Sequence, residues 1–211
     1  MEEGVWLRAE RQTAGRGRQG RAWASPVGNF YGSTLVRLRP ADPAPATLGF
    51  VAAVALQQVV ADLLPTARAM LKWPNDLLVD GAKLSGVLLE RGEDAVVVGI
   101  GVNLAHHPDL PDRRTTSLAA LGAPVAPEGF AEMLADGFAR WLARWRAEGF
   151  APVRGRWLER AHPSGAAMSA HLPDGDRVEG LFDGLDAEGA LILRLADGAQ
   201  RVIHAGDVFL V

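Results

Sequence analysis

The sequence has 211 residues, of which 48% are hydrophobic and 22% charged, a composition typical of an ordinary globular protein. The absence of cysteine excludes disulfides, thiolate catalysis and zinc–thiolate sites. The net charge of −3 argues against a protein that binds nucleic acid through a general basic surface.

The N-terminal residues MEEGVWLRAER have neither the basic region nor the apolar region of a secretion signal. The longest apolar stretch, residues 48–64, contains Gln57, Gln58 and Asp62. It therefore predicts a core helix and not a membrane span. Together with the lack of cysteine, these features lead us to expect a cytoplasmic protein with no membrane and no nucleic-acid partner.

The first three quarters of the chain predict an α+β domain with a mixed or antiparallel sheet and helices on one side. Apolar alternation and β-branched residues predict strands over residues 5–10, 29–38, 69–73, 77–80, 83–91 and 95–102. Apolar residues at helical spacing predict helices over residues 46–64, 128–148 and 152–161. The pair Asp80-Gly81 is a hairpin signal, and residues 103–116 have the composition of a loop.

The composition changes after the segment His162-Pro163-Ser164-Gly165. Turn pairs then recur in short intervals at residues 174–175, 183–184, 188–189, 197–198 and 205–206. Short strands joined by closely spaced turns are typical of a small β-barrel. The sequence therefore predicts two domains, residues 1–163 and residues 164–211.

A basic glycine-rich segment follows the first predicted strand. Residues 8–21 contain five arginines and one glutamate, and Gly15, Gly17 and Gly20 exclude regular structure there. Glycine allows close approach of the backbone to a ligand, and arginine supplies forked donors for phosphate or carboxylate. The same residues also fit a solvated flexible loop, or an arm that reads the DNA minor groove. If the segment binds an anion, we expect it to be mobile until the anion orders it.

A second candidate segment, Lys72-Trp73-Pro74-Asn75-Asp76, lies where a predicted strand ends. A carboxylate beside an amide suits Mg²⁺ on a nucleotide, and Lys83 opens the strand after next. Lys72 and Lys83 are the only lysines in a chain with 20 arginines. A simple turn is the alternative interpretation of Pro-Asn-Asp.

A third candidate segment is the apolar run that ends at Asn103. Gly99 and Gly101 interrupt it, which suggests that another group packs closely on its backbone. Asn103 follows directly, and it fits either a ligand contact or a turn that ends the strand.

These three segments together resemble the biotin–protein ligase family. Its Gly-Arg-Gly-Arg-x-Gly-Arg loop matches residues 15–21, with Gln12 before and Trp23 after. Its Lys-Trp-Pro-Asn-Asp motif, followed by a lysine and a glycine, matches residues 72–86, and its Gly-x-Gly-x-Asn strand matches residues 99–103. The resemblance covers nearly the whole chain, and it implies a catalytic domain of the class II aminoacyl-tRNA synthetase and biotin ligase type, followed by an SH3-like barrel.

The resemblance implies an ATP-dependent reaction in two steps. Biotin and ATP give biotinyl-5′-AMP, and a lysine of a biotin carboxyl carrier protein then takes the biotin. The catalytic residues implied are Lys83 and Arg18. Biotin would contact Gln12, Gly15, Arg16, Lys83 and Gly86. ATP or the adenylate would contact Arg16, Arg18, Arg21, Trp23, Asn75, Asp76 and Asn103. Mg²⁺ would contact Asp76.

The sequence departs from the family pattern at its start. The family normally begins with a strand and a helix that carry a Ser/Thr-Thr-Asn motif for the ureido ring of biotin, and Met1 falls within or just after that helix. We therefore expect either a start upstream or weaker biotin binding, and an incomplete sheet edge that could pair in a homodimer.

No DNA-binding domain precedes the motifs, so a repressor role is not expected. Three alternatives to a biotin–protein ligase remain. A lipoate-type acyl-adenylate ligase shares the predicted architecture but is not expected to carry the arginine loop. A non-catalytic adenylate-binding remnant or a nucleic-acid-binding module would also explain single segments.

Overall fold

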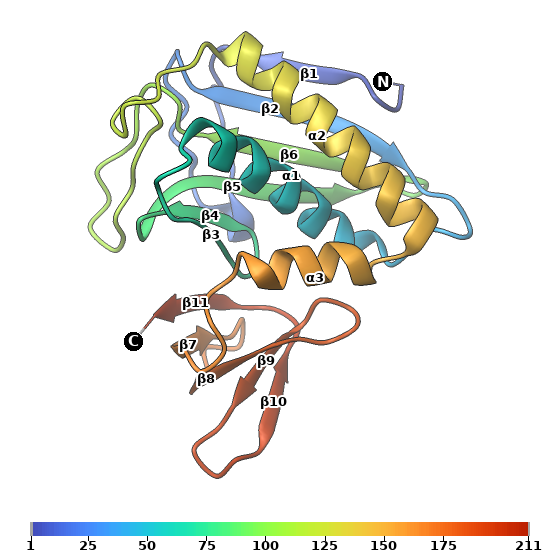
Figure 1. Ribbon diagram of the computed structural model, residues 1–211, viewed down its shortest axis with the longest axis vertical. Coiled ribbons are helices and arrows are strands. Elements are labelled where there is room, and N and C mark those ends of the chain that lie inside the picture. Colours follow the sequence, from blue (N-terminus) through green and yellow to red (C-terminus); the bar gives the residue numbers. More distant parts are fainter. Residues whose placement is uncertain (1, 211) are drawn as a thin grey trace.

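A six-stranded antiparallel sheet forms the centre of the larger part of the molecule (Figure 1). The computed structural model describes residues 2–210. The sheet has the order β1-β2-β6-β5-β4-β3. Its strands are β1 (Trp6–Ala9), β2 (Phe30–Arg37), β3 (Ala69–Lys72), β4 (Asp76–Val79), β5 (Ala82–Arg91) and β6 (Ala95–Val102). All six predicted strands and the hairpin at Asp80-Gly81 are therefore confirmed.

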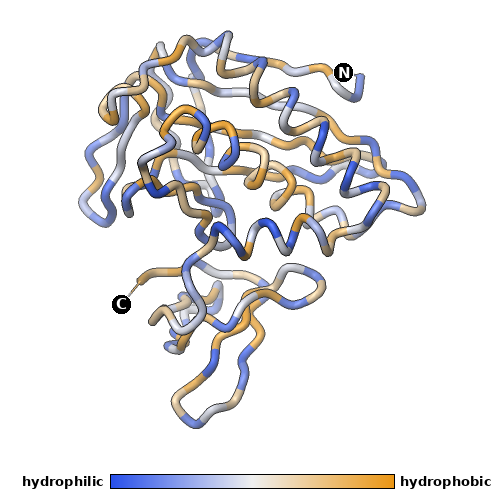
Figure 2. Tube along the Cα trace, viewed as in Figure 1, coloured by the Kyte–Doolittle hydropathy of each residue, from blue (hydrophilic) through white to orange (hydrophobic). Residues whose placement is uncertain are grey.

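Helices cover one face of this sheet, as the sequence predicts (Figure 1). They are α1 (Leu48–Leu63), α2 (Pro127–Glu148) and α3 (Ala151–Glu159). The helix α1 is hydrophobic nearly throughout, whereas α3 is largely hydrophilic (Figure 2). Residues 45–63 are long and apolar enough to cross a membrane, but 67% of the apolar window is buried inside the molecule. This burial identifies α1 as a core helix.

The two faces of β6 differ, and this difference creates a functional surface. Val96, Val98 and Ile100 are buried beneath the helices. Because side chains alternate along a strand, Gly99 and Gly101 face the opposite side of the sheet. The central position of β6, between β2 and β5, confirms the predicted buried strand.

A five-stranded antiparallel sheet follows Pro163, in the order β10-β9-β8-β7-β11. Its strands are β7 (Ala167–His171), β8 (Arg177–Leu185), β9 (Leu191–Arg194), β10 (Gln200–Ile203) and β11 (Asp207–Leu210). Within residues 2–210, β10 and β11 do not pair, so the predicted barrel is an SH3-like sheet that is not closed. The turn predicted at Asp183-Gly184 is wrong: Gly184, with a φ of 113°, lies inside β8 at a shift of register, so its conformational freedom serves a bulge.

The second sheet packs closely against the first part of the chain. The indole Nε1 of Trp73 donates a hydrogen bond of 3.0 Å to the carbonyl of Gly189. A Cβ atom added to Gly189 would lie 2.6 Å from the ring of Phe50, whose centroid is 5.2 Å from that of Phe150. This close packing fixes where β11 lies relative to the six-stranded sheet.

Glu3 fastens the N-terminal residues to α2. Its Oε1 lies 2.6 Å from Nη1 of Arg146, and its Oε2 accepts a hydrogen bond of 2.8 Å from the backbone N–H of Arg37. The hydrogen bond from Arg146 is the main reason that the pKa of Glu3 is lowered from 4.5 to about 2. The ionised form of Glu3 is therefore favoured in the folded state.

We expect Glu3→Gln to destabilise the protein by about 1–3 kcal/mol at pH 7. The folded-state pKa of Glu3 is lower than its value in the unfolded chain, so its contribution is present above about pH 4.5 and disappears as the pH falls toward 2. Denaturant unfolding of both proteins at pH 7 and at pH 3 measures this. An equal stability difference at the two pH values would contradict the assigned ion pair.

Candidate functional site

A cavity of about 750 Å³ lies on the face of the six-stranded sheet that the helices leave uncovered. The sheet provides its floor, and the arginine loop (residues 11–23) provides one wall. Strand β11, which belongs to the second sheet, closes one end. Of the site residues predicted from the sequence, those that line the cavity are Gln12, Arg16, Arg18, Arg21, Trp23, Asn75, Asp76, Lys83, Gly86 and Asn103. The three candidate segments therefore meet at one place.

The floor of the cavity contains a flat area without side chains. Gly101 lies between Tyr31 of β2 and Gly86 of β5, directly opposite each of them. A Cβ atom on Gly101 would lie 2.7 Å from the indole ring of Trp23, so only glycine permits this contact. The predicted close approach to the β6 backbone is confirmed, and the group that approaches is Trp23.

Lys83 enters the cavity because β5 contains a β-bulge. Leu77 lies opposite Ser85, but Leu78 lies opposite Lys83, so β5 has one extra residue there. A regular strand would place Lys83 on the same face as Ser85, which is fully buried. The extra residue turns Lys83 toward the cavity and Leu84 into the core.

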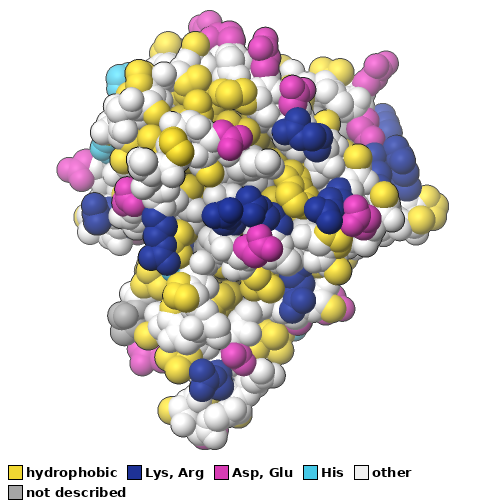
Figure 3. All heavy atoms as spheres, viewed as in Figure 1, with side chains coloured by type: hydrophobic (Ala, Val, Ile, Leu, Met, Phe, Trp, Pro, Cys, Tyr) yellow, Lys and Arg dark blue, Asp and Glu magenta, His cyan; other side chains and the backbone are white. Residues whose placement is uncertain are grey.

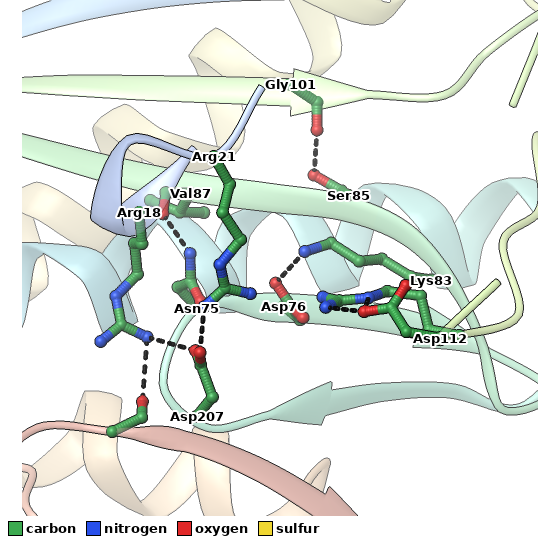
Figure 4. Close-up of polar contacts among 12 residues, drawn as sticks. Arg18, Arg21, Asn75, Asp76, Lys83, Ser85, Val87, Gly101, Asp112 and Asp207 are labelled. Atoms are coloured by element: carbon green, nitrogen blue, oxygen red, sulfur yellow. Dashed lines mark hydrogen bonds and ion pairs between the residues drawn. The ribbon is translucent and has the colours of Figure 1, made fainter. Parts of the chain in front are cut away.

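Lys83 and Asp76 form an ion pair at the charged end of the cavity (Figure 4). Nζ of Lys83 lies 2.6 Å from Oδ1 of Asp76, and the two side chains are only 17% and 9% exposed. The same Nζ lies 5.6 Å from the centroid of the Trp23 ring. The ammonium is thus held in place between a carboxylate and an aromatic face, beside the glycine floor.

The arginine loop is docked on the second sheet through Asp207 (Figure 4). Arg18 lies 3.6 Å from the carboxylate of Asp207 and donates a hydrogen bond of 3.2 Å to the carbonyl of Gly206. Arg21 also pairs with Asp207. Burial lowers the pKa of Arg18, and Asp207 counteracts this effect. The loop contains one short 3-10 turn, Arg18–Gly20, which the sequence did not predict.

We expect Asp207→Asn to raise amide hydrogen exchange in residues 16–21 by about 3- to 10-fold in the protein without ligand, because exposed or half-exposed ion pairs contribute up to about 1 kcal/mol. Mass spectrometry of exchanged peptides measures this. A matched control is Asp94→Asn, which breaks an exposed pair with Arg37 of 2.9 Å. Exchange in the loop that is as slow in Asp207→Asn as in the control would show that Asp207 does not hold the loop.

Gln12 and Gly15 form the inner part of the arginine loop. The hydroxyl of Ser25 donates to Oε1 of Gln12 at 2.9 Å, which leaves the amide N–H₂ of Gln12 free for other contacts. Gly15 does not line the cavity: a Cβ atom there would lie 2.6 Å from the carbonyl oxygen of Trp23. Gly15 therefore allows the loop to fold closely on itself beside the site.

Asn75 and Asn103 line the cavity and also hold neighbouring backbone. Nδ2 of Asn75 donates to the carbonyl of Val87 at 2.7 Å, and Nδ2 of Asn103 donates to the carbonyl of Thr116 at 3.1 Å. Their Nδ2 groups are therefore engaged, and their Oδ1 atoms are the groups best suited to a ligand contact. Asn75 thereby holds the turn before Asp76 against β5, and Asn103 holds the end of β6 against residue 116.

Sequence reasoning missed several residues of the cavity. Arg113 and Asp112 form an ion pair in the loop after β6, and Asn29 organises that loop by accepting three backbone hydrogen bonds from residues 104–106. Asp207 and Phe209 come from β11. Asn29 is one of only three asparagines in the chain, and this rarity is its sole signal in the sequence. No sequence signal linked β11 to the arginine loop.

The comparisons with known proteins agree with this geometry. Residues 2–104 match the model of the biotin/lipoate A/B protein ligase family, and residues 171–211 match the biotin protein ligase C-terminal domain. A biotin–[acetyl-CoA-carboxylase] ligase of Paracoccus denitrificans is 44% identical over 97% of this chain and 90% of its own length. The corresponding ligase of Mycobacterium tuberculosis is 36% identical over 98% of this chain and 79% of its own length.

A solved structure supports the fold. The biotin protein ligase of Aquifex aeolicus in complex with biotin and ATP matches with a TM-score of 0.88 at 24% identity, and the match covers all of this chain and 91% of the other. At this identity the match bears on the fold alone. The sequence relatives extend the conclusion from the fold to the family, because they are similar to this chain along most of both chains. The chain belongs to the biotin–protein ligase family.

Proposed function

We propose that this chain is an ATP-dependent biotin–protein ligase. It forms biotinyl-5′-AMP from biotin and ATP and then transfers the biotin to a lysine of a biotin carboxyl carrier protein. The observation that carries the proposal is the ammonium of Lys83, which a β-bulge directs to the boundary between a flat glycine floor and a basic loop. The P. denitrificans relative, named a biotin–[acetyl-CoA-carboxylase] ligase, supports the same activity.

The floor is suited to the bicyclic ring of biotin. Two residues further along the strands from Gly101 and Gly86, a second row faces the cavity. In it, Gly99 lies opposite both Ser33 and Leu88. This area is mostly apolar, with one hydroxyl available for hydrogen bonding. A ring on this floor directs its carboxylate toward Lys83, beside Gln12 and Arg16, which we propose as further biotin contacts together with Gly86. Gly15 would act indirectly, by shaping the loop.

In the first step, a carboxylate oxygen of biotin attacks the α-phosphorus of ATP, the bond from that phosphorus to the β-phosphate oxygen breaks, and pyrophosphate leaves. Lys83 stabilises the negative charge shared by the carboxylate and the α-phosphate. Because Lys83 is already held by Asp76, little reorganisation is needed when that charge develops. Arg16, Arg18 and Arg21 bind phosphate oxygens, and Trp23 and the Oδ1 atoms of the two asparagines contact the nucleotide.

In the second step, the amine of the carrier lysine attacks the carbonyl carbon of the adenylate. The carbon–oxygen bond to AMP breaks, and the amine loses one proton. The role of the arginine loop is to exclude water from the anhydride until the carrier arrives. Arg18, with its contacts to β11, is the residue that we expect to keep this loop closed.

Mg²⁺ fits this site only as part of a metal–nucleotide complex. Residues 2–210 contain no cluster of three or more His, Asp or Glu side chains that could hold a metal ion. Mg²⁺ on a nucleotide needs only one or two carboxylates, and we propose Asp76 as the contact. The ion would neutralise charge on the phosphates.

We propose further that residues 1–163 form the catalytic domain and residues 164–211 the SH3-like domain. A cytoplasmic location remains our expectation, because the chain has no cysteine.

The outer edge of β1 is unpaired within the described residues, and Leu7 there is 67% exposed, which supports pairing of two copies. On the helical face, acidic side chains lie among the basic ones (Figure 3), which does not favour nucleic acid.

Product analysis tests the activity. The protein is incubated with MgATP and either biotin or lipoate, and the acyl-adenylate is identified by mass. We expect biotinyl-AMP and pyrophosphate from biotin, and little adenylate from lipoate. A preference for lipoate would support the lipoate-type ligase, and the absence of both adenylates would support a non-catalytic remnant.

A further inference from the structure

The cavity contains a second lysine, Lys72, to which the two steps above assign no role. Lys72 ends β3 and lies opposite Asp76 of β4, which in turn lies opposite Gly86 of β5. These three residues therefore continue the row that starts at Tyr31 and Gly101, and they face the same side of the sheet. The side chain of Lys72 is half-buried and lines the cavity.

Most carboxylates around Lys72 are already paired with other cations. Asp76 pairs with Lys83, Asp112 with Arg113, and Asp207 with both Arg18 and Arg21. Glu90 also lines the cavity, but it lies opposite Val97, toward the other end of the strands.

Lys72 itself has no carboxylate partner within 4.0 Å among residues 2–210. Burial lowers the pKa of Lys72, and the nearby cations Lys83 and Arg113 lower it further. An ammonium that is half-buried and has no direct carboxylate partner costs stability unless a ligand supplies negative charge close to it.

The surroundings of Lys72 define where that negative charge would lie. Nζ of Lys72 lies 5.5 Å from the centroid of the Phe209 ring, an attractive contact that holds the ammonium beside β11. Asp76 and Asp207 are the carboxylates that act on it from a longer distance. Lys72 thus lies between the Lys83–Asp76 pair and the point where the arginine loop meets β11.

We propose that Lys72 binds the pyrophosphate half of ATP, the leaving group of adenylation. This inference rests on the proposed function, in which Lys83 serves the carboxylate and the α-phosphate. The bond that breaks leaves its electron pair on the oxygen of pyrophosphate, so negative charge grows on the side away from Lys83. A lysine with three donors and no carboxylate partner is suited to that charge.

The inference makes a stability prediction that a structural role would not make. Lys72→Gln removes a half-buried charge that has no direct carboxylate partner, and it keeps most of the side-chain volume. We therefore expect its melting temperature to equal or exceed that of the wild-type protein. A clearly lower melting temperature, or failure to fold, would show that Lys72 serves the fold and would overturn the proposal.

Calorimetric titration with inorganic pyrophosphate and with AMP, each in the presence of Mg²⁺, tests the binding itself. Lys72→Gln should weaken pyrophosphate binding by about 10- to 100-fold, which is typical for loss of hydrogen bonds to a charged group. AMP binding should stay within about twofold, because AMP lacks the two phosphates concerned. Lys72→Arg, which keeps the charge, should lose less than the glutamine variant.

The matched control is Arg91→Gln, which removes an exposed positive charge at the end of β5, away from the cavity lining. It should bind both ligands as the wild-type protein does. Unchanged pyrophosphate affinity in Lys72→Gln, or an equal loss for AMP and pyrophosphate, would overturn the inference. If the wild-type protein makes biotinyl-AMP in either of these cases, the proposed function stands and only the role of Lys72 fails. If the wild-type protein makes no adenylate, the proposed function fails, and the pyrophosphate titration still reports on Lys72.

Discussion

Lys83→Met is expected to lower the rate of biotinyl-AMP formation by about 10²- to 10³-fold, which corresponds to about 3–4 kcal/mol of transition-state stabilisation. The ammonium is the one cation that lies both beside the glycine floor and at the charged end of the cavity, among the described residues. Its loss also leaves the carboxylate of Asp76, which is 9% exposed, without its partner. We therefore expect a stability loss of about 1–3 kcal/mol in addition.

Lys83→Arg separates these two effects. A guanidinium still pairs with Asp76 and keeps most of the stability, but its planar fork cannot replace a compact point charge at the reacting oxygens. Single-turnover adenylation and thermal unfolding of both variants measure the two effects. Near-normal adenylation by Lys83→Met would refute the assigned role, and full rescue by arginine would show that the role is only electrostatic at long range.

Arg18→Gly is expected to release biotinyl-AMP into solution about 10- to 100-fold faster than the wild-type protein, because an ion pair of up to about 1 kcal/mol and a charge-assisted hydrogen bond of about 1.5 kcal/mol are lost. The substitution removes the contacts of Arg18 with Asp207 and with the carbonyl of Gly206, so the loop is no longer fastened to β11. The freed anhydride acylates lysines that no specific recognition selects. Serum albumin added to the reaction should therefore become biotinylated.

The control for this experiment is Arg11→Gly, which removes an exposed arginine at the start of the same loop. Detection of biotin on albumin by mass spectrometry compares the two variants. Labelling of albumin that is equal for Arg18→Gly, Arg11→Gly and the wild-type protein would show that the contacts to β11 do not seal the site.

Local sequence patterns predicted the sheet well but not the face on which Lys83 lies. The alternation in β2 and β6, the pair Asp80-Gly81 and the helical spacing of α2 each reflect contacts between neighbouring residues. The bulge opposite Leu77 and Leu78 does not have such a local signature. A shift of one residue moves a side chain to the other face, so strand prediction alone leaves the position of the key lysine undetermined.

The contribution of β11 lay beyond sequence reasoning for a different reason. Asp207 and Arg18 are separated by 189 positions in the sequence. The packing of the second sheet against Trp73 and Phe50 brings them together. The resemblance located the arginine loop, but it did not indicate which residue neutralises the loop. The open form of the second sheet was missed because turn pairs predict strands without predicting which edges pair.

The most direct test of the central claim is the mass of a carrier protein after reaction. The chain is incubated with biotin, MgATP and the carrier domain of a biotin-dependent carboxylase, and the intact mass of the carrier is measured. We predict an increase of one biotinyl group, which requires ATP and is lost when the acceptor lysine of the carrier is replaced by arginine. A carrier that remains unmodified, under conditions in which an established biotin–protein ligase modifies it fully, would contradict the account.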